Sequence, residues 1–112
     1  MIEVGKDNFE EEVLEEDGVV LVDFWGEGCD RCLELMPEVE EMEEEYGDEI
    51  KFTKVKIKGN RRLAMRHQVM GLPSIVFFVD GEKLKIKSRP ILKLAWTLTW
   101  NNRLLIKNHG GV

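Results

Sequence analysis

The hydrophobic pattern of the chain is strongest over Val19–Trp25, where apolar residues follow one another and only Asp23 interrupts them. A continuous apolar run of this length is typical of a strand that is buried on both faces of a sheet. A short glycine-containing break follows, and apolar residues then recur at helical spacing as far as Tyr46. The pattern therefore predicts a central strand that leads into a long helix over about residues 29–46.

The rest of the first 86 residues alternates between strand-like and helix-like patterns. Helices are expected after two polar residues that can cap them, from Asp7 to about Leu14 and from Asn60 to about Val69. Further strands are expected at about 2–4, 50–58, 75–79 and 84–86, the last two joined by a hairpin turn at Asp80-Gly81. His67, on the second of these helices, is expected to face solvent. Because the alternation ends in a hairpin, we expect an α/β fold with a mixed central sheet and helices on both faces.

The composition fits one domain over residues 1–112. With 43% hydrophobic and 34% charged residues, the chain is able to bury a core and still present a charged surface to water. The first ten residues lack the basic and apolar segments of a leader, and no apolar run approaches the roughly 18 residues of a membrane span. We therefore expect a cytoplasmic protein with no membrane contact.

The charges are unevenly distributed: all 22 acidic residues lie within residues 1–82, whereas seven of the 16 basic residues lie within 83–112. Residues 87–112 are compositionally atypical, and they also hold Trp96 and Trp100. A basic tail can indicate a nucleic acid or an acidic partner. Here the basic residues are dispersed among apolar ones, without a basic cluster or a known binding motif, so the pattern argues against nucleic-acid binding.

Cys29 and Cys32 are the only cysteines, and they fall in the first turn of the predicted long helix. Free backbone N–H groups and the positive end of the helix dipole stabilise an anion there, including a thiolate. Two thiols with two residues between them can close a small disulfide ring and reopen it. Two other interpretations stay open, half of a zinc site and a pair of unreactive core cysteines. A tetrahedral zinc site needs four ligands, however, and His67 and His109 are not at a ligand spacing, so the pattern favours redox chemistry without a metal.

Two charged residues occupy positions where strand periodicity predicts apolar side chains. Asp23 interrupts the first apolar strand, and Lys54 shares a face with Ile50 and Phe52 in the next one. An isolated buried charge costs far more than a paired one, so we expect the two side chains to approach each other. The pair is either a structural ion pair or a functional one, in which Asp23 moves protons for Cys32 and Lys54 sets the pKa of Asp23.

Several features in register resemble the thioredoxin family over about residues 2–86. They are Asp23-Phe24-Trp25 before the cysteines, Cys29 and Cys32 with two residues between them, Pro37 five residues after the second cysteine, Lys54 in the central strand, and Gly71-Leu72-Pro73 before the fourth strand. The resemblance implies a thioredoxin fold. It also implies a monomeric thiol-disulfide oxidoreductase that reduces protein disulfides with no cofactor beyond its own redox-active cysteines.

The resemblance further implies catalytic roles for individual residues and two kinds of partner. Cys29 would attack the substrate disulfide, and Cys32 would resolve the mixed disulfide. Asp23 and Lys54 match the family's buried carboxylate and its partner. The partners would be disulfide-containing proteins and a flavin-dependent thioredoxin reductase that supplies electrons. The alternative from another class is a docking module of the same fold in which the thiols are incidental.

The substrate-binding surface that the resemblance implies surrounds a cis proline and consists of Trp25, Gly28, Leu72 and Pro73. The sequence departs from the family here, because Gly28 stands where the family usually has tryptophan and Asp30-Arg31 where it usually has Gly-Pro. Asp30 and Arg31 are therefore expected to tune the reactivity of Cys29. Asp30 is expected to cap the helix and point to water, and Arg31 to lie over the sulfur and favour the thiolate.

Overall fold

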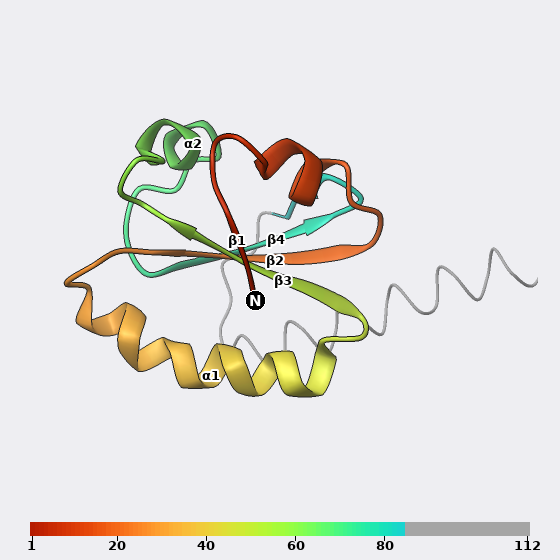
Figure 1. The fold of residues 1–112 in the computed structure, drawn as a ribbon, viewed down its shortest axis with the longest axis horizontal. Helices are drawn as coiled ribbons and strands as arrows, with labels where there is room; N and C mark the ends of the chain where they lie inside the picture. The colour runs from red at the N-terminus through yellow and green to blue at the C-terminus, as the bar shows by residue number, and fades with distance from the viewer. Residues whose placement is uncertain (85–112) are drawn as a thin grey trace, which may run out of the picture.

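The structure is a computed structural model that describes residues 1–84. A five-stranded mixed sheet forms its centre (Figure 1). The strands lie in the order β1-β3-β2-β4-β5, with β1, β3 and β2 parallel and with β4 and β5 each antiparallel to the preceding strand in this order. Their bounds are β1 Ile2–Val4, β2 Val19–Trp25, β3 Ile50–Lys56, β4 Ser74–Val79 and β5 Glu82–Lys83. The expected mixed sheet is confirmed. The last strand, expected at 84–86, is observed as β5 at Glu82–Lys83, and Leu84 lies outside it; the expectations for Ile86 and for residues 87–112 lie outside the described residues.

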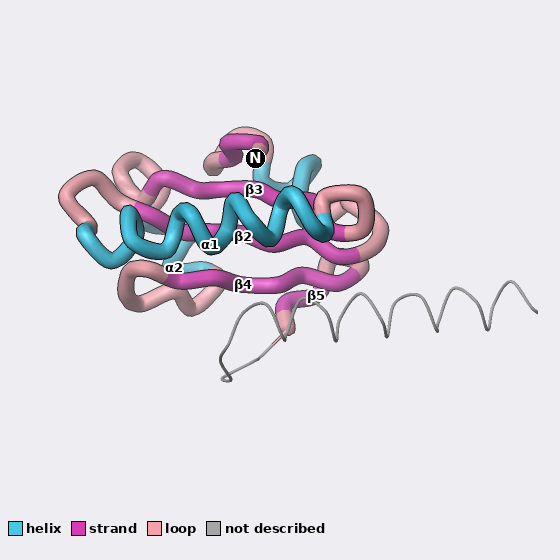
Figure 2. The backbone as a smooth tube through the Cα atoms, turned by 90° about the horizontal axis from the view of Figure 1, so that it is seen from below, coloured by secondary structure: helices cyan, strands magenta, loops and turns pink. Residues whose placement is uncertain are grey.

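Helices cover both faces of this sheet, as the alternating pattern predicts (Figure 1 and Figure 2). Helix α1, Asp30–Tyr46, lies along one face, and η1, Glu10–Leu14, and α2, Arg61–Arg66, lie on the other. Successive side chains of a strand point to opposite faces, so each layer has its own core. The core under α1 contains Val19, Leu21, Val39, Met42, Ile50, Phe52 and Phe77. The core under η1 and α2 contains Phe9, Val13, Val20, Val22, Phe24, Val55, Leu63, Ala64 and Phe78.

The register of β2 and β3 places the two unexpected strand charges opposite each other. Asp23 is paired with Lys54, and Trp25 is paired with Lys56. By strand alternation all four side chains lie on the face that α1 covers. Because parallel strands end at the same edge of a sheet, the ends of β2 and β3 and the start of α1 share one edge. The two cysteines lie at that edge.

The start of η1 differs from the sequence prediction. The position that precedes this single π-helical turn is Phe9, so Asp7 does not cap it. The side chain of Asn8 accepts a hydrogen bond from the Gly5 N–H at 2.7 Å and closes the turn before it. Asn60 likewise does not cap α2, because its side chain binds backbone groups of two other segments. Burying the ring of Phe9 stabilises the fold by about 2 kcal/mol or more, which outweighs the roughly 1 kcal/mol of a cap.

The end of α2 also differs from the sequence prediction, since the helix stops at Arg66, three residues early. Gln68 has a φ of 62°, which a right-handed helix does not allow. His67 is half-buried rather than solvated: its ring centroid lies 4.9 Å from that of Phe9 and 5.6 Å from that of Phe78. Burial, with help from two neighbouring cations, lowers the pKa of His67.

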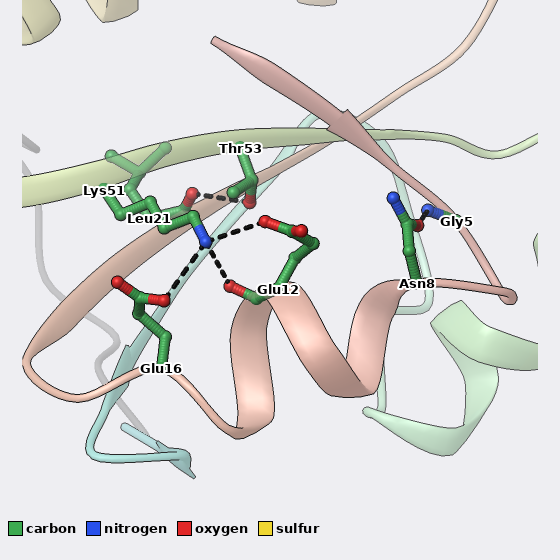
Figure 3. A network of polar contacts seen from close by, with 7 residues as sticks. All are labelled: Gly5, Asn8, Glu12, Glu16, Leu21, Lys51 and Thr53. Atoms are coloured by element: carbon green, nitrogen blue, oxygen red, sulfur yellow. Dashed lines mark hydrogen bonds and ion pairs between the residues drawn. The ribbon is translucent and has the colours of Figure 1, made fainter.

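Lys51 ties η1 to the sheet (Figure 3). Its ammonium donates to the backbone carbonyl of Glu12 at 2.9 Å, to the carboxylate of Glu12 at 2.8 Å and to that of Glu16 at 3.2 Å. Beside it, the buried hydroxyl of Thr53 donates to the carbonyl of Leu21 at 2.9 Å and links β3 to β2. These contacts hold a short helix that has few backbone hydrogen bonds of its own.

Replacing Lys51 with methionine is expected to lower the free energy of unfolding by about 1 kcal/mol, because it removes a half-buried ion pair together with a hydrogen bond to a carbonyl. Urea unfolding measures the change. Lys58→Met is the matched control, since Lys58 is exposed and forms no ion pair within residues 1–84. Equal urea midpoints for the two variants would mean that the Lys51 contacts add no stability.

Candidate active site

Cys29 and Cys32 form a disulfide at the start of α1, with their Cα atoms 5.3 Å apart. Strand β2 delivers the chain to this point through the loop Gly26–Gly28. Gly28 has a φ of +76°, a conformation that L side chains rarely adopt, so the turn into the helix favours glycine. Cys29 is partly exposed, whereas Cys32 is 4% exposed. The two sulfurs are therefore not equally accessible to another protein.

The sulfur of Cys29 itself occupies the N-cap position of α1. It accepts a hydrogen bond from the backbone N–H of Cys32 at 3.2 Å. The expectation that Asp30 caps the helix is therefore wrong: Asp30 is the first helical residue, and it is exposed. A sulfur at an N-cap receives an otherwise unpaired N–H and faces the positive end of the helix dipole. Both effects stabilise a thiolate more than a thiol.

A second loop meets the disulfide loop at the same end of the sheet (Figure 1). The peptide bond between Leu72 and Pro73 is cis. The next residue, Ser74, is paired with Phe24 in the antiparallel register of β2 and β4, so Pro73 lies beside the end of β2. The loops are in close contact, because a Cβ on Gly26 would lie 2.8 Å from Cδ1 of Leu72. The structure thus brings together the regions that the sequence predicts for substrate binding.

Asp23 lies in β2, two residues before the strand ends, on the face that α1 covers, and is 2% exposed. Burial raises its pKa from 3.8 to about 6, and the positive charge of Lys54 opposes part of that rise. The two residues are paired in register, and the charge of Lys54 acts on Asp23, but they form no direct ion pair among the described residues. The Oδ1 atom of Asp23 has no hydrogen-bond partner within residues 1–84. A buried carboxyl with a pKa near neutrality is suited to gaining and losing a proton.

A cluster of charges around Trp25 was not predicted. The ammonium groups of Lys54 and Lys56 lie 6.0 and 5.7 Å from the centroid of the Trp25 ring. Lys56 also forms an ion pair with Glu27 of the loop before Cys29, at 2.6 Å. Strand periodicity could have indicated Lys56, because it shares a face with Lys54. Glu27 could not be found from the sequence, since its contact depends on the path of a loop.

The exposed residues near the disulfide differ in charge and polarity. Asp30 and Arg31 are both exposed. Two large apolar side chains are exposed as well, Leu33 at 68% in the first turn of α1 and Met70 at 86% just before the cis-proline loop. The surface next to the disulfide therefore offers both charged and apolar contacts.

Within residues 1–84 no three histidine, cysteine or acidic side chains are grouped so that they could hold a metal ion. In the same part of the chain, no helix has the length and apolar character needed to cross a membrane.

Sequence comparisons relate most of the chain to one family. Residues 1–94 match the family model described as Thioredoxin. A thioredoxin of Acetoanaerobium sticklandii is 51% identical over 84 residues, which cover 75% of this chain and 80% of that protein. A thioredoxin of Peptoclostridium acidaminophilum is 41% identical over 85 residues, or 76% of this chain and 77% of that protein. A thioredoxin of Buchnera aphidicola subsp. Schizaphis graminum is 42% identical over 94 residues, which cover 84% of this chain and 87% of that protein.

Proposed function

The chain belongs to the thioredoxin family and is a thiol-disulfide oxidoreductase, and we propose that Cys29 is its attacking thiol and Cys32 its resolving thiol. The observation that carries this assignment is the capping contact, in which the Cys29 sulfur accepts the Cys32 N–H at 3.2 Å. The same sulfur is the more accessible of the two. A thiolate that is both stabilised and accessible is the better nucleophile for a disulfide in another protein.

The proposed reaction moves two electrons from the dithiol to the substrate. The Cys29 thiolate attacks one substrate sulfur, the substrate S–S bond breaks, and the departing substrate thiolate takes a proton. Cys32 then loses its proton and attacks the Cys29 sulfur, which releases the second substrate thiolate. The substrate disulfide is reduced and the protein is left with its own disulfide. Asp23 is the proposed acceptor of the Cys32 proton, supported by its pKa of about 6.

The oxidised protein must be reduced again before another turnover. We infer that a flavin-dependent thioredoxin reductase does this, and that the protein works as a monomer in the cytoplasm, the compartment in which reductants keep thiols reduced. Leu72 and Pro73, beside Trp25 and Gly28, are the proposed contact surface for the substrate chain. Reduction of a disulfide-containing protein faster than by dithiothreitol alone tests the proposed function.

The departure of the active-site sequence from the usual family pattern leads to a proposal for its reduction potential. Arg31 is exposed next to the cysteine ring, and a guanidinium there favours the thiolate of the reduced form. Stabilising the reduced form makes the pair a stronger oxidant. We therefore expect a potential less negative than the roughly −270 mV of thioredoxin, in the direction of the about −180 mV of protein disulfide isomerase.

Replacing Arg31 with alanine is expected to make the potential more negative by roughly 5–20 mV, the equivalent of the ~0.2–1 kcal/mol of an exposed charge pair. The Cys29 thiolate should then be less populated at a given pH. Equilibration with a glutathione buffer measures the potential, and ultraviolet absorbance of the thiolate measures its population.

Arg31→Lys is the matched control, since it keeps the positive charge and should keep most of the effect. Asp30→Asn should change the potential in the opposite direction, because the carboxylate opposes the thiolate. A potential that stays constant or becomes less negative in Arg31→Ala would contradict the proposed role of Arg31.

A further inference from the structure

Helix α1 and the segment that follows it in the chain carry opposite net charge. Helix α1 holds eight acidic residues and one basic residue. The segment from Ile50 to Val79, which includes β3 and α2, holds seven basic residues and no acidic one. Of the basic residues, Lys56 ends β3 at the edge of the sheet that holds the cysteines, whereas most acidic residues of α1 lie in its later turns. Such asymmetry selects partners by their charge.

Lys56 is the basic residue of β3 that the structure ties most directly to the active site. It is paired in register with Trp25, and its ammonium lies 5.7 Å from the centroid of that ring. The ammonium is 2.6 Å from the carboxylate of Glu27, which belongs to the loop that leads to Cys29. Lys56 thus has an apolar wall on one side and a carboxylate on the other.

In the ion pair between Lys56 and Glu27, another carboxylate can readily replace that of Glu27. The side chain of Glu27 is 64% exposed and that of Lys56 is 32% exposed, so Glu27 can leave the pair and remain hydrated. Exposed pairs of this kind add little stability. Lys54, the other ammonium over Trp25, lies opposite the buried Asp23 and is not equally available.

We propose that Lys56 forms a subsite for a carboxylate of the substrate protein, next to the disulfide that Cys29 attacks, and that Glu27 occupies this subsite while no substrate is bound. The ammonium of Lys56 supplies the charge, and the ring of Trp25 supplies a flat surface for the aliphatic part of a glutamate or aspartate side chain. The subsite rests on the proposed function, since it selects substrates for that reaction. Lys56 in this role determines specificity and takes no part in the chemical step.

The test uses the full-length protein with dithiothreitol as reductant and three cystine peptides that differ only in whether glutamate, glutamine or lysine flanks the cystine. The wild type should show the highest kcat/KM for the glutamate peptide and the lowest for the lysine peptide, with about threefold between successive peptides at low salt. Lys56→Gln should remove this preference, so that the three peptides show similar kcat/KM values. Glu27→Gln should raise kcat/KM for the glutamate peptide by lowering its KM.

Arg66→Gln is the matched control, because it removes an exposed positive charge at the far end of α2 and should keep the preference. The double variant with Glu27→Gln and Lys56→Gln should behave as Lys56→Gln alone. If Lys56→Gln lowers kcat/KM equally for all three peptides, the proposed subsite is wrong. Such an equal loss indicates a structural effect on Trp25, which does not depend on peptide charge. If the wild type reduces none of the peptides, the proposed function fails together with the subsite.

Discussion

Replacing Cys29 with serine is expected to lower disulfide reduction by about a thousandfold or more, the scale on which removing a nucleophile acts. Replacing Cys32 with serine should instead leave one attack possible and block the second. The reason is the geometry of the site: Cys29 is partly exposed and its sulfur takes the N-cap contact, whereas Cys32 is 4% exposed. Cys32→Ser should therefore accumulate a mixed disulfide between Cys29 and the substrate.

Mass spectrometry and non-reducing electrophoresis measure this accumulation, and the variant with both cysteines replaced is the control. If Cys29→Ser traps more substrate than Cys32→Ser does, the two roles are reversed. The same variants address the docking alternative. A docking module would keep its function without either thiol, whereas an oxidoreductase loses it.

The path from β2 into α1 could be predicted from the sequence because two strong signals coincide there. The apolar run over Val19–Trp25 is long enough to be buried on both faces, and the structure buries every residue of it except Trp25, which is half-buried. The helical spacing that follows places Val39 and Met42 in the core under α1. Local pattern and tertiary packing agree in this region, so the elements follow from the pattern alone.

The features that the sequence did not predict depend on contacts between distant segments. Cys29 and Asp30 are both able to cap the start of α1. Only the path of the backbone decides that Cys29 occupies the N-cap position. His67 is half-buried because Phe9 and Phe78, from segments far apart in the chain, pack against it. The pair between Lys56 and Glu27 needs both the strand register and the loop path. Such contacts leave no periodic signal.

Replacing Asp23 with asparagine is expected to raise the free energy of unfolding at pH 7 to 8 by up to about 3 kcal/mol, which is the value of a pKa shift from 3.8 to about 6. Well below pH 3.8 the carboxyl is protonated in the folded and the unfolded protein, so its charge costs nothing. Between pH 4 and 6 the folded protein binds more protons than the unfolded chain, and the wild type loses stability as the pH rises. Well above pH 6 the full cost of burying the charge is present.

The stability difference between Asp23→Asn and the wild type should therefore be smallest at the acid end of the range, grow from about pH 4 to 6 and become constant well above pH 6. Urea unfolding of the oxidised proteins from pH 3.5 to pH 8 measures it. Asp48→Asn is the matched control, because Asp48 is exposed and its replacement should change stability little at any pH. A difference that does not depend on pH would mean that the charge of Asp23 is not the source of the cost.

The same variant should slow disulfide exchange near neutral pH, because the proton of Cys32 loses its acceptor when the mixed disulfide is resolved. The wild-type rate should rise with an inflection near pH 6 as the carboxyl of Asp23 loses its proton, and this inflection should be absent in Asp23→Asn. Stopped-flow measurement of mixed-disulfide resolution as a function of pH tests this directly. A variant that gains stability but keeps the wild-type profile would make Asp23 a structural residue, whose buried charge weakens the fold without serving the reaction.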